Sequence, residues 1–232
     1  MNGESSEIND KGKNYYSTSA QPDAINLKEH WNHVYVNSPE EKLGWYENDL
    51  TPTFDMINKT GLSKSARILN IGSGSSTLID ELLSLEYSNI SATDISDISL
   101  NNLKTRLGKA SNKVEWIVDD LTNPTLLNKI QPVDLWIDRA VLHFFTESKD
   151  QNIYFNLLKS KVKQGGFVMF AEFNTEGAVK CSGLSVNRYS KEMLIEKLGN
   201  DFNLVHSFNH IYTMPSGSLR PYIYALFKRE RE

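Results

Sequence analysis

The chain has 232 residues, of which 39% are hydrophobic and 23% charged, and its formal net charge is −4. These values are ordinary for a soluble globular protein, and the length suits one α/β domain with a full core. No block of lysine and arginine stands out, so we expect no nucleic-acid partner. The single cysteine, Cys181, excludes an intrachain disulfide and a cysteine-based zinc site, and we expect no metal.

The first residues are polar. Residues 1–24 contain few aliphatic side chains and no apolar stretch of the signal-peptide type, which predicts a disordered tail. No apolar run is long enough to span a bilayer, so we expect no membrane partner and a cytoplasmic protein. Residues 25–232 are expected to form a single domain, and the sequence does not indicate its oligomeric state.

Residues 25–60 are expected to form a helical cap on that domain. Apolar residues recur at helical spacing over residues 25–36. Pro52 suits the first turn of a second helix that runs to residue 59, because proline has no N–H to lose there. Gly61 ends this helix and leads into the strand around which the chain is organised.

A short apolar run at residues 68–71 ends at the turn Gly72-Ser73-Gly74, and a helical pattern follows at once. Strand, glycine turn and helix form the opening unit of a nucleotide-binding α/β fold, although such a turn is also a common tight connection. Thr77 and Asp80 predict a partial capping box at the start of the helix. Thr77 also stands where a dinucleotide-binding turn has its third glycine.

The rest of the chain alternates between strands and helices and then ends in two strands. The predicted strands are residues 89–94, 114–118, 133–137, 167–172, 202–213 and 222–228, and the predicted helices are residues 99–107, a short one from Pro124, 149–162 and 191–198. This alternation predicts a three-layer α/β fold with a seven-stranded, mostly parallel sheet. The last two strands have no helix between them, so we expect a C-terminal antiparallel hairpin.

Several motifs in this order resemble class I S-adenosylmethionine (SAM)-dependent methyltransferases over residues 28–229. Small residues stand at Gly72, Gly74 and Ser76, Asp94 follows Gly74 by 20 positions, and residues 119–121 read Asp-Asp-Leu. The resemblance implies the Rossmann-like methyltransferase fold and SAM as the cofactor. It places Gly72 and Gly74 against that cofactor.

The resemblance also assigns roles to the residues that follow the first three strands. Asp94, with Ile95 beside it, would accept the ribose hydroxyls, although an aspartate here also suits a cap for the next turn. Asp120 would bind the adenine amino group and the Leu121 N–H a ring nitrogen; Asp119 competes for the first role, and a solvated acid pair is the alternative. Asn70 stands where the family has an acid, so it would meet the ammonium group of SAM without a charge.

Aromatic residues of the cap resemble a narrower group. The patterns around Trp31, Tyr35 and Trp45 are similar to the entry segment of methyltransferases that modify lysines of elongation factors. In that group the matching aromatic residues close over SAM. Ordinary packing of the helical cap against the core explains the same pattern.

The acceptor of the methyl group is expected at the carboxyl ends of the fourth and fifth strands, where ligands of such sheets bind. Asp138 is the candidate catalytic base and a further cofactor contact, and His143 is the second titratable candidate or a buried structural histidine. The candidate substrate residues are Arg139, His143, Glu172, Arg188 and Tyr189. Carboxylates here favour an amine, whereas Arg139, Lys180 and Arg188 favour an acceptor that bears a carboxylate or phosphate.

The sequence therefore predicts a SAM-dependent methyltransferase that acts on a small molecule or on a protein lysine. One alternative is an NAD(P)-dependent short-chain reductase, which requires a Tyr-x-x-x-Lys motif on a helix. The chain has this spacing at Tyr224 and Lys228, on a predicted strand. The other alternative is a non-catalytic adapter that keeps the fold without the chemistry.

Overall fold

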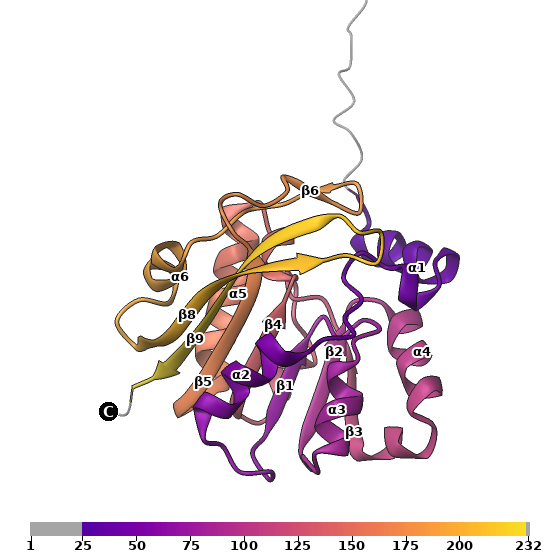
Figure 1. The fold of residues 1–232 in the computed structure, drawn as a ribbon. Helices are drawn as coiled ribbons and strands as arrows, with labels where there is room; N and C mark the ends of the chain where they lie inside the picture. The colour runs from indigo at the N-terminus through magenta and orange to yellow at the C-terminus, as the bar shows by residue number, and fades with distance from the viewer. Residues whose placement is uncertain (1–24, 231–232) are drawn as a thin grey trace, which may run out of the picture.

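A computed structural model describes residues 25–230, so the predicted tail at residues 1–24 lies outside the described residues. The main strands are β1 (Ile68–Ile71), β2 (Ile90–Asp94), β3 (Val114–Val118), β4 (Val133–Arg139), β5 (Val162–Phe173), β8 (Phe202–Thr213) and β9 (Leu219–Arg229). They form one seven-stranded sheet in the order β3-β2-β1-β4-β5-β9-β8 (Figure 1). Strands β1 to β5 are parallel to one another, and β9 runs antiparallel to both β5 and β8. This is the predicted sheet with its C-terminal hairpin.

Helices cover both faces of the sheet. They are α1 (Leu27–Asn37), α2 (Thr51–Thr60), α3 (Leu78–Ser84), α4 (Asp97–Leu107), α5 (Ser148–Lys161) and α6 (Lys191–Leu198), with 3₁₀ turns η1 (Glu40–Lys42), η2 (Gly108–Lys113), η3 (Leu127–Lys129) and η4 (Leu142–Phe144). One core cluster joins α5 and α6 to the sheet, and a second joins α2, α3 and α4 to its other face. Every residue of β1 and β2 is buried, as expected for strands covered on both sides. No helix of residues 25–230 is long and apolar enough to cross a membrane.

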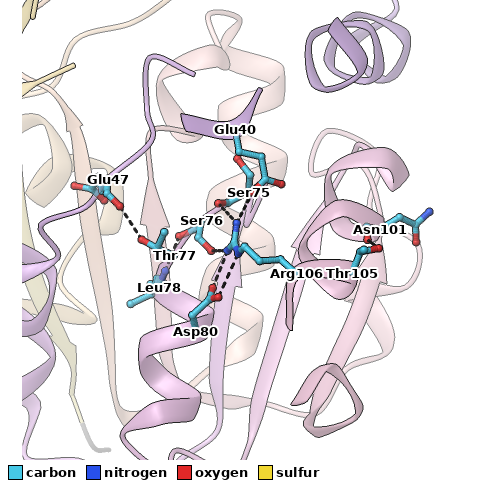
Figure 2. Close-up of polar contacts among 10 residues, drawn as sticks. All are labelled: Glu40, Glu47, Ser75, Ser76, Thr77, Leu78, Asp80, Asn101, Thr105 and Arg106. Carbon is cyan, nitrogen blue, oxygen red and sulfur yellow. Dashed lines mark hydrogen bonds and ion pairs between the residues drawn. The ribbon is translucent and has the colours of Figure 1, made fainter. Parts of the chain in front are cut away.

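The predicted capping box at the start of α3 is wrong. Thr77 makes no side-chain capping bond, because its hydroxyl donates to the carbonyl of Glu47 at 2.9 Å. Asp80 instead forms an ion pair with Arg106 of α4 at 2.7 Å (Figure 2). Both side chains of the predicted capping box therefore bind partners that are distant in the sequence and not the backbone at the helix start.

The short helix predicted from Pro124 is also wrong. The segment after β3 is a loop that enters η3, because the Asp119 carboxylate accepts hydrogen bonds from the backbone N–H groups of Thr125 and Leu127. The side chain thus takes donors that would otherwise begin a helix.

Two elements of the C-terminal half are larger than predicted. β5 begins at Val162 rather than at Phe167, with a register irregularity in its pairing with β4. The segment between β5 and α6, where no strand or helix was predicted, contains a small antiparallel hairpin of β6 (Lys180–Cys181) and β7 (Leu184–Ser185). In Figure 1 this hairpin and α1 lie at the end of the molecule to which the carboxyl ends of the parallel strands point.

Candidate functional site

A cavity of about 280 Å³ lies at the carboxyl edge of the sheet. The ends of β1 to β5 and of β9 contribute to its lining, together with α1 and the β6–β7 hairpin. Ligands of open α/β sheets bind at this edge. The geometry of the lining residues therefore indicates what this chain can hold.

The glycine turn after β1 is pressed between two other segments. Gly72 and Gly74 have φ values of 53° and 50°, in the left-handed region that favours glycine. A Cβ atom on Gly72 would lie 2.2 Å from a methyl group of Val141, and one on Gly74 would lie 2.4 Å from the Tyr35 hydroxyl. The turn thus leaves no room for a side chain at these two positions. Gly72 lines the cavity, whereas Gly74, also predicted to contact the cofactor, lies behind it and donates to Asp94.

Asp94 lies at the end of β2 and lines the cavity. One of its oxygens accepts a hydrogen bond from the Gly74 N–H and the other from the Ser96 N–H, both at 2.8 Å. Burial raises the pKa of its carboxyl to about 6, although the Ser96 and Gly74 N–H groups oppose the shift. Each oxygen keeps a further lone pair, so the carboxylate is suited to the adjacent hydroxyls of a ribose.

The two aspartates after β3 differ in what they already bind. Asp119 uses both oxygens to hold the following loop, through Thr125 and Leu127. Asp120 uses one oxygen, which accepts from the backbone and hydroxyl of Thr122. Both aspartates line the cavity, as Ile95 and Leu121 do. Asp120 is thus the one with an uncommitted oxygen among the described residues, which favours the predicted adenine contact.

Aromatic side chains of the cap line the cavity and also pack against one another. The ring centroids of Trp31 and Trp45 lie 5.6 Å apart, those of Tyr35 and Trp45 lie 6.0 Å apart, and Trp31 meets Phe144 edge-on at 5.0 Å. Burial and the charge of Asp94 raise the pKa of Tyr35. The two predictions for these residues, closure over a ligand and packing of the cap, are thus compatible.

A second, smaller cavity of about 40 Å³ shares Trp45, Gly72 and Arg139 with the first. Asn70 lines it. Its lining also includes Thr53 and Ser75, whose hydroxyl oxygens are buried and lack hydrogen-bond partners among the described residues, as does Nη2 of Arg139. Buried polar atoms normally have partners, so this cavity is built for a small polar group or an ordered water.

Arg139 was predicted to bind the substrate, and it lines both cavities. Its guanidinium pairs with Glu47 at 2.8 Å and donates to the Trp45 carbonyl at 3.1 Å. The rings of Tyr212 and Tyr222 lie 5.0 and 5.2 Å from it. Burial lowers the pKa of Arg139, but Glu47, Tyr222 and Tyr224 together outweigh this effect, so the pKa ends above its usual range. Much of its charge is therefore already compensated.

Asp138 was predicted to contact the cofactor and to act as a base, but it is fully buried and does not line either cavity. It accepts hydrogen bonds from the Val141 N–H at 3.0 Å and from the Tyr154 hydroxyl at 2.5 Å. Side chains alternate along a strand, so Arg139 faces the cavities while Asp138 faces α5. Burial and the charge of Glu172 raise the pKa of Asp138.

Three other predicted substrate residues are buried beside Asp138 and outside the cavity linings: His143, Glu172 and Tyr189. His143 Nδ1 lies 2.8 Å from Glu172, and burial raises the pKa of Glu172 to about 8. The carboxylates of Asp138 and Glu172 thus hold the loop after β4, because they accept hydrogen bonds from its backbone N–H groups. His143 takes the structural role that was its alternative.

Arg188 also lies outside the cavities. It is exposed, and its guanidinium donates to the carbonyl of Thr175 at 2.8 Å. Arg220, Met214 and Tyr222 instead reach the cavity from the β8–β9 hairpin, which sequence reasoning did not assign to a site. No local pattern marks these residues, because the hairpin is distant in sequence from the glycine turn that it approaches.

No protein-family model matches the sequence, and no curated protein matches it. The structure is nevertheless similar to solved methyltransferases. A SAM-dependent methyltransferase from Anabaena variabilis is 16% identical with a TM-score of 0.72, covering 89% of this chain and 96% of that one. The N-methyltransferase NodS from Bradyrhizobium japonicum, solved with S-adenosyl-L-homocysteine, is 12% identical with a TM-score of 0.67, covering 89% and 100%.

A third similar structure is the Burkholderia thailandensis 1,6-didemethyltoxoflavin-N1-methyltransferase, solved with 1,6-didemethyltoxoflavin and S-adenosylhomocysteine. It is 14% identical with a TM-score of 0.61, and the match covers 88% of this chain and 84% of that one. These likenesses extend over most of each chain. The chain therefore has the Rossmann-like fold of SAM-dependent methyltransferases.

Proposed function

We propose that the protein is a SAM-dependent methyltransferase. The observation that carries the proposal is the joint placement of the glycine turn, Asp94 and Asp120 around one cavity. Asp94 offers paired oxygens for a ribose, and Asp120 offers an uncommitted oxygen for an adenine amino group. The solved methyltransferases of the same fold support this assignment of the cofactor.

The second cavity suits the amino-acid end of SAM. Arg139 Nη2, the Ser75 hydroxyl and the Thr53 hydroxyl supply donors for a carboxylate, and all three lack partners among the described residues. Asn70 and Glu47 supply acceptors for an ammonium group in the same lining. The two adjoining cavities thus offer groups that match both ends of the cofactor, and the three donors of the smaller cavity fit its carboxylate.

When bound, the sulfonium of SAM supplies an activated methyl group that leaves by in-line displacement. The chain has to position the acceptor, exclude water and, where the acceptor is protonated, accept a proton. The cap aromatics Trp31, Tyr35 and Trp45 exclude water on one side of the cavity. Because Asp138 and Glu172 are buried outside the lining, we propose that catalysis here depends mainly on proximity and desolvation.

A small-molecule acceptor is better supported than a protein lysine. The carboxylates Asp138 and Glu172, which favoured an amine, do not reach the cavity. Both α1 and the β6–β7 hairpin contribute to the lining, so a protein side chain would have to enter past these segments. The resemblance of the cap to lysine methyltransferases remains the basis of the second candidate.

The reductase alternative lacks support in the geometry. Tyr224 and Lys228 lie on β9, and four residues of strand separate them by roughly 13 Å. With their Cα atoms this far apart on one strand, the tyrosine hydroxyl and the lysine amine are not placed to share a proton. The adapter alternative shares the fold and the cavity and differs from an enzyme only in activity. The experiment described next therefore distinguishes it.

The proposal is tested by calorimetric titration of S-adenosylhomocysteine and NADH into the purified full chain, followed by incubation with radiolabelled SAM and cell extract. We expect saturable binding of S-adenosylhomocysteine and transfer of label to a small-molecule fraction. Label on protein would select the lysine candidate. Absence of S-adenosylhomocysteine binding at millimolar ligand would reject the proposal, and binding without transfer would favour the adapter.

A further inference from the structure

The charged residues that line the larger cavity are divided by sign. Its three carboxylates are Asp94, Asp119 and Asp120, at the ends of β2 and β3. Its three cations are Arg139, Lys180 and Arg220, on β4, β6 and β9. The sheet order places β3 and β9 five strand intervals apart, or roughly 24 Å. Asp119 and Asp120 therefore lie at one end of the cavity, the acidic end, and Arg220 lies toward the other, with Arg139 of β4 between them. Lys180 lines the cavity from the β6–β7 hairpin, which follows β5 in the chain, and we call the part lined by Arg220 and Lys180 the basic end.

The acidic end is the one proposed for the adenosine of SAM, so a cofactor bound there leaves the region over β5 and β9 for a second molecule. The lining of that region is largely apolar and aromatic. Phe173 and Tyr222 meet edge-on with centroids 5.0 Å apart, and Phe144, Cys181 and Met214 complete the surface. Such walls favour a flat apolar body over a flexible polar chain.

The three cations of the lining are not equivalent. Arg139 already pairs with Glu47. Lys180 and Arg220 form no ion pair with any carboxylate among residues 25–230, and both line the cavity. Two uncompensated cations beside an apolar wall attract an anion more than they attract a cationic lysine side chain.

We propose that this end of the cavity is an acceptor subsite for a small molecule with a flat apolar body and one anionic group. Phe173 and Tyr222 contact the body, and Lys180 and Arg220 pair with the anion. This inference rests on the proposed function, because it assigns the acidic end to SAM. It goes beyond that function by specifying the chemistry of the acceptor.

The test compares 2-naphthoate with 2-naphthamide, which share the flat body and differ in charge. Each is titrated by ligand-observed NMR into the full chain saturated with S-adenosylhomocysteine. We expect the acid to bind about fivefold more tightly than the amide, since partly exposed ion pairs contribute modestly. The double variant Lys180→Ala/Arg220→Ala should abolish that preference while it keeps its affinity for S-adenosylhomocysteine.

The matched control is Lys109→Ala/Lys113→Ala, which removes the same charge from exposed positions of η2. The control should keep the preference for the acid. The proposal is overturned if acid and amide bind equally, if neither binds at millimolar concentration, or if the preference survives in Lys180→Ala/Arg220→Ala. Loss of S-adenosylhomocysteine binding by the wild type would instead reject the proposed function, so the two failures are distinguishable.

Discussion

At the residue scale, Asp94 both holds the glycine turn and faces the cavity. Its oxygens accept the Gly74 and Ser96 N–H groups, which orient the carboxylate toward a fixed position. Burial opposes its charge, so its pKa of about 6 lies close to neutral pH. The same carboxylate therefore holds the turn and is proposed to bind ribose, and its charge changes with pH near neutrality.

Asp94→Asn should weaken the binding of S-adenosylhomocysteine by about ten- to a hundredfold. The amide nitrogen has no lone pair for the N–H groups or for a ribose hydroxyl, and hydrogen bonds to a charged group contribute roughly 1.5–3 kcal/mol. Calorimetric titration measures the change. Asp55→Asn, at an exposed position of α2, is the control and should bind as the wild type does. Equal affinity of the folded Asp94→Asn protein would reject the ribose assignment.

The affinity for S-adenosylhomocysteine should also fall as the pH is lowered through about 6. Protonation of Asp94 below its raised pKa removes the acceptor that the ribose uses. Titrations at a series of pH values from about 8 to about 5 measure this dependence. In Asp94→Asn the affinity should stay low and vary little over that range. A wild-type affinity that is independent of pH would contradict the role of the carboxylate.

At the scale of elements, Arg106 of α4 joins three other segments (Figure 2). Its guanidinium pairs with Asp80 of α3 and with Glu40 of η1, and it donates to the carbonyls of Ser75 and Ser76. These contacts connect the cap, the segment after the glycine turn and two helices through one side chain. The side chain is 28% exposed, so water weakens the pairs only in part.

Arg106→Ala should lower the free energy of unfolding by about 1–2 kcal/mol, because it leaves four acceptors without their donor. It should also weaken S-adenosylhomocysteine binding, since the cap and the turn lose their common anchor. Urea denaturation and calorimetry measure the two effects. Thr105→Ala is the matched control on the same helix, because the Thr105 hydroxyl donates to the Asn101 carbonyl of α4 itself. A loss of equal size in the control would refute the anchoring role.

The elements themselves were largely predictable, because their signals are local. The apolar run of β1 and the glycines after it specify strand and turn, and the two final strands without a helix between them specify the hairpin. The capping box at Thr77 failed for the opposite reason. Thr77 and Asp80 bind Glu47 and Arg106, which are too far away in the sequence for a local pattern to include them.

The site was predictable where a residue follows a strand that borders the cavity, as at Asp94 and Asp120. It was less predictable where the face of the strand decides whether a side chain reaches the cavity or the core. Asp138 and Arg139 are neighbours in sequence, but alternation along β4 sends one into the core and the other to the cavities. Arg220 had no local signal, since the β8–β9 hairpin brings it to the cavity.

At the scale of the whole molecule, the buried acids should make stability depend on pH. Asp138 and Glu172 lie together, faced by His143 from η4, Tyr154 from α5 and Tyr189 before α6. Burial raises the pKa of Glu172 from 4.5 to about 8, so the folded protein binds a proton that the unfolded chain has released between these values. This contribution to stability is fully present below the unfolded pKa and is lost as the pH rises through the folded one.

The free energy of unfolding of the wild type should therefore fall, relative to that of Glu172→Gln, as the pH rises from about 4.5 to about 8. Glutamine cannot release a proton, so the variant lacks the contribution of residue 172 and keeps only that of Asp138. Urea denaturation at a series of pH values measures both curves. Glu115→Gln on β3, whose carboxylate accepts from Ser91 at a partly exposed position, is the control and should follow the wild type. Parallel curves for the wild type and Glu172→Gln would contradict the raised pKa.

The order of strands in the sheet has a consequence for how this chain can diversify. From β1, the third of the seven strands, the chain first builds outward through β2 to β3. It then builds in the other direction through β4 and β5, and the β8–β9 hairpin completes that side with β8 at the edge. The acidic end of the cavity is therefore encoded by residues 72–121, and the basic end by residues 139–222, as two blocks that do not interleave. Recombination between related genes at a single crossover could exchange one block and keep the other intact. Arg139, proposed above for the amino-acid end of SAM, would then be exchanged together with the acceptor subsite.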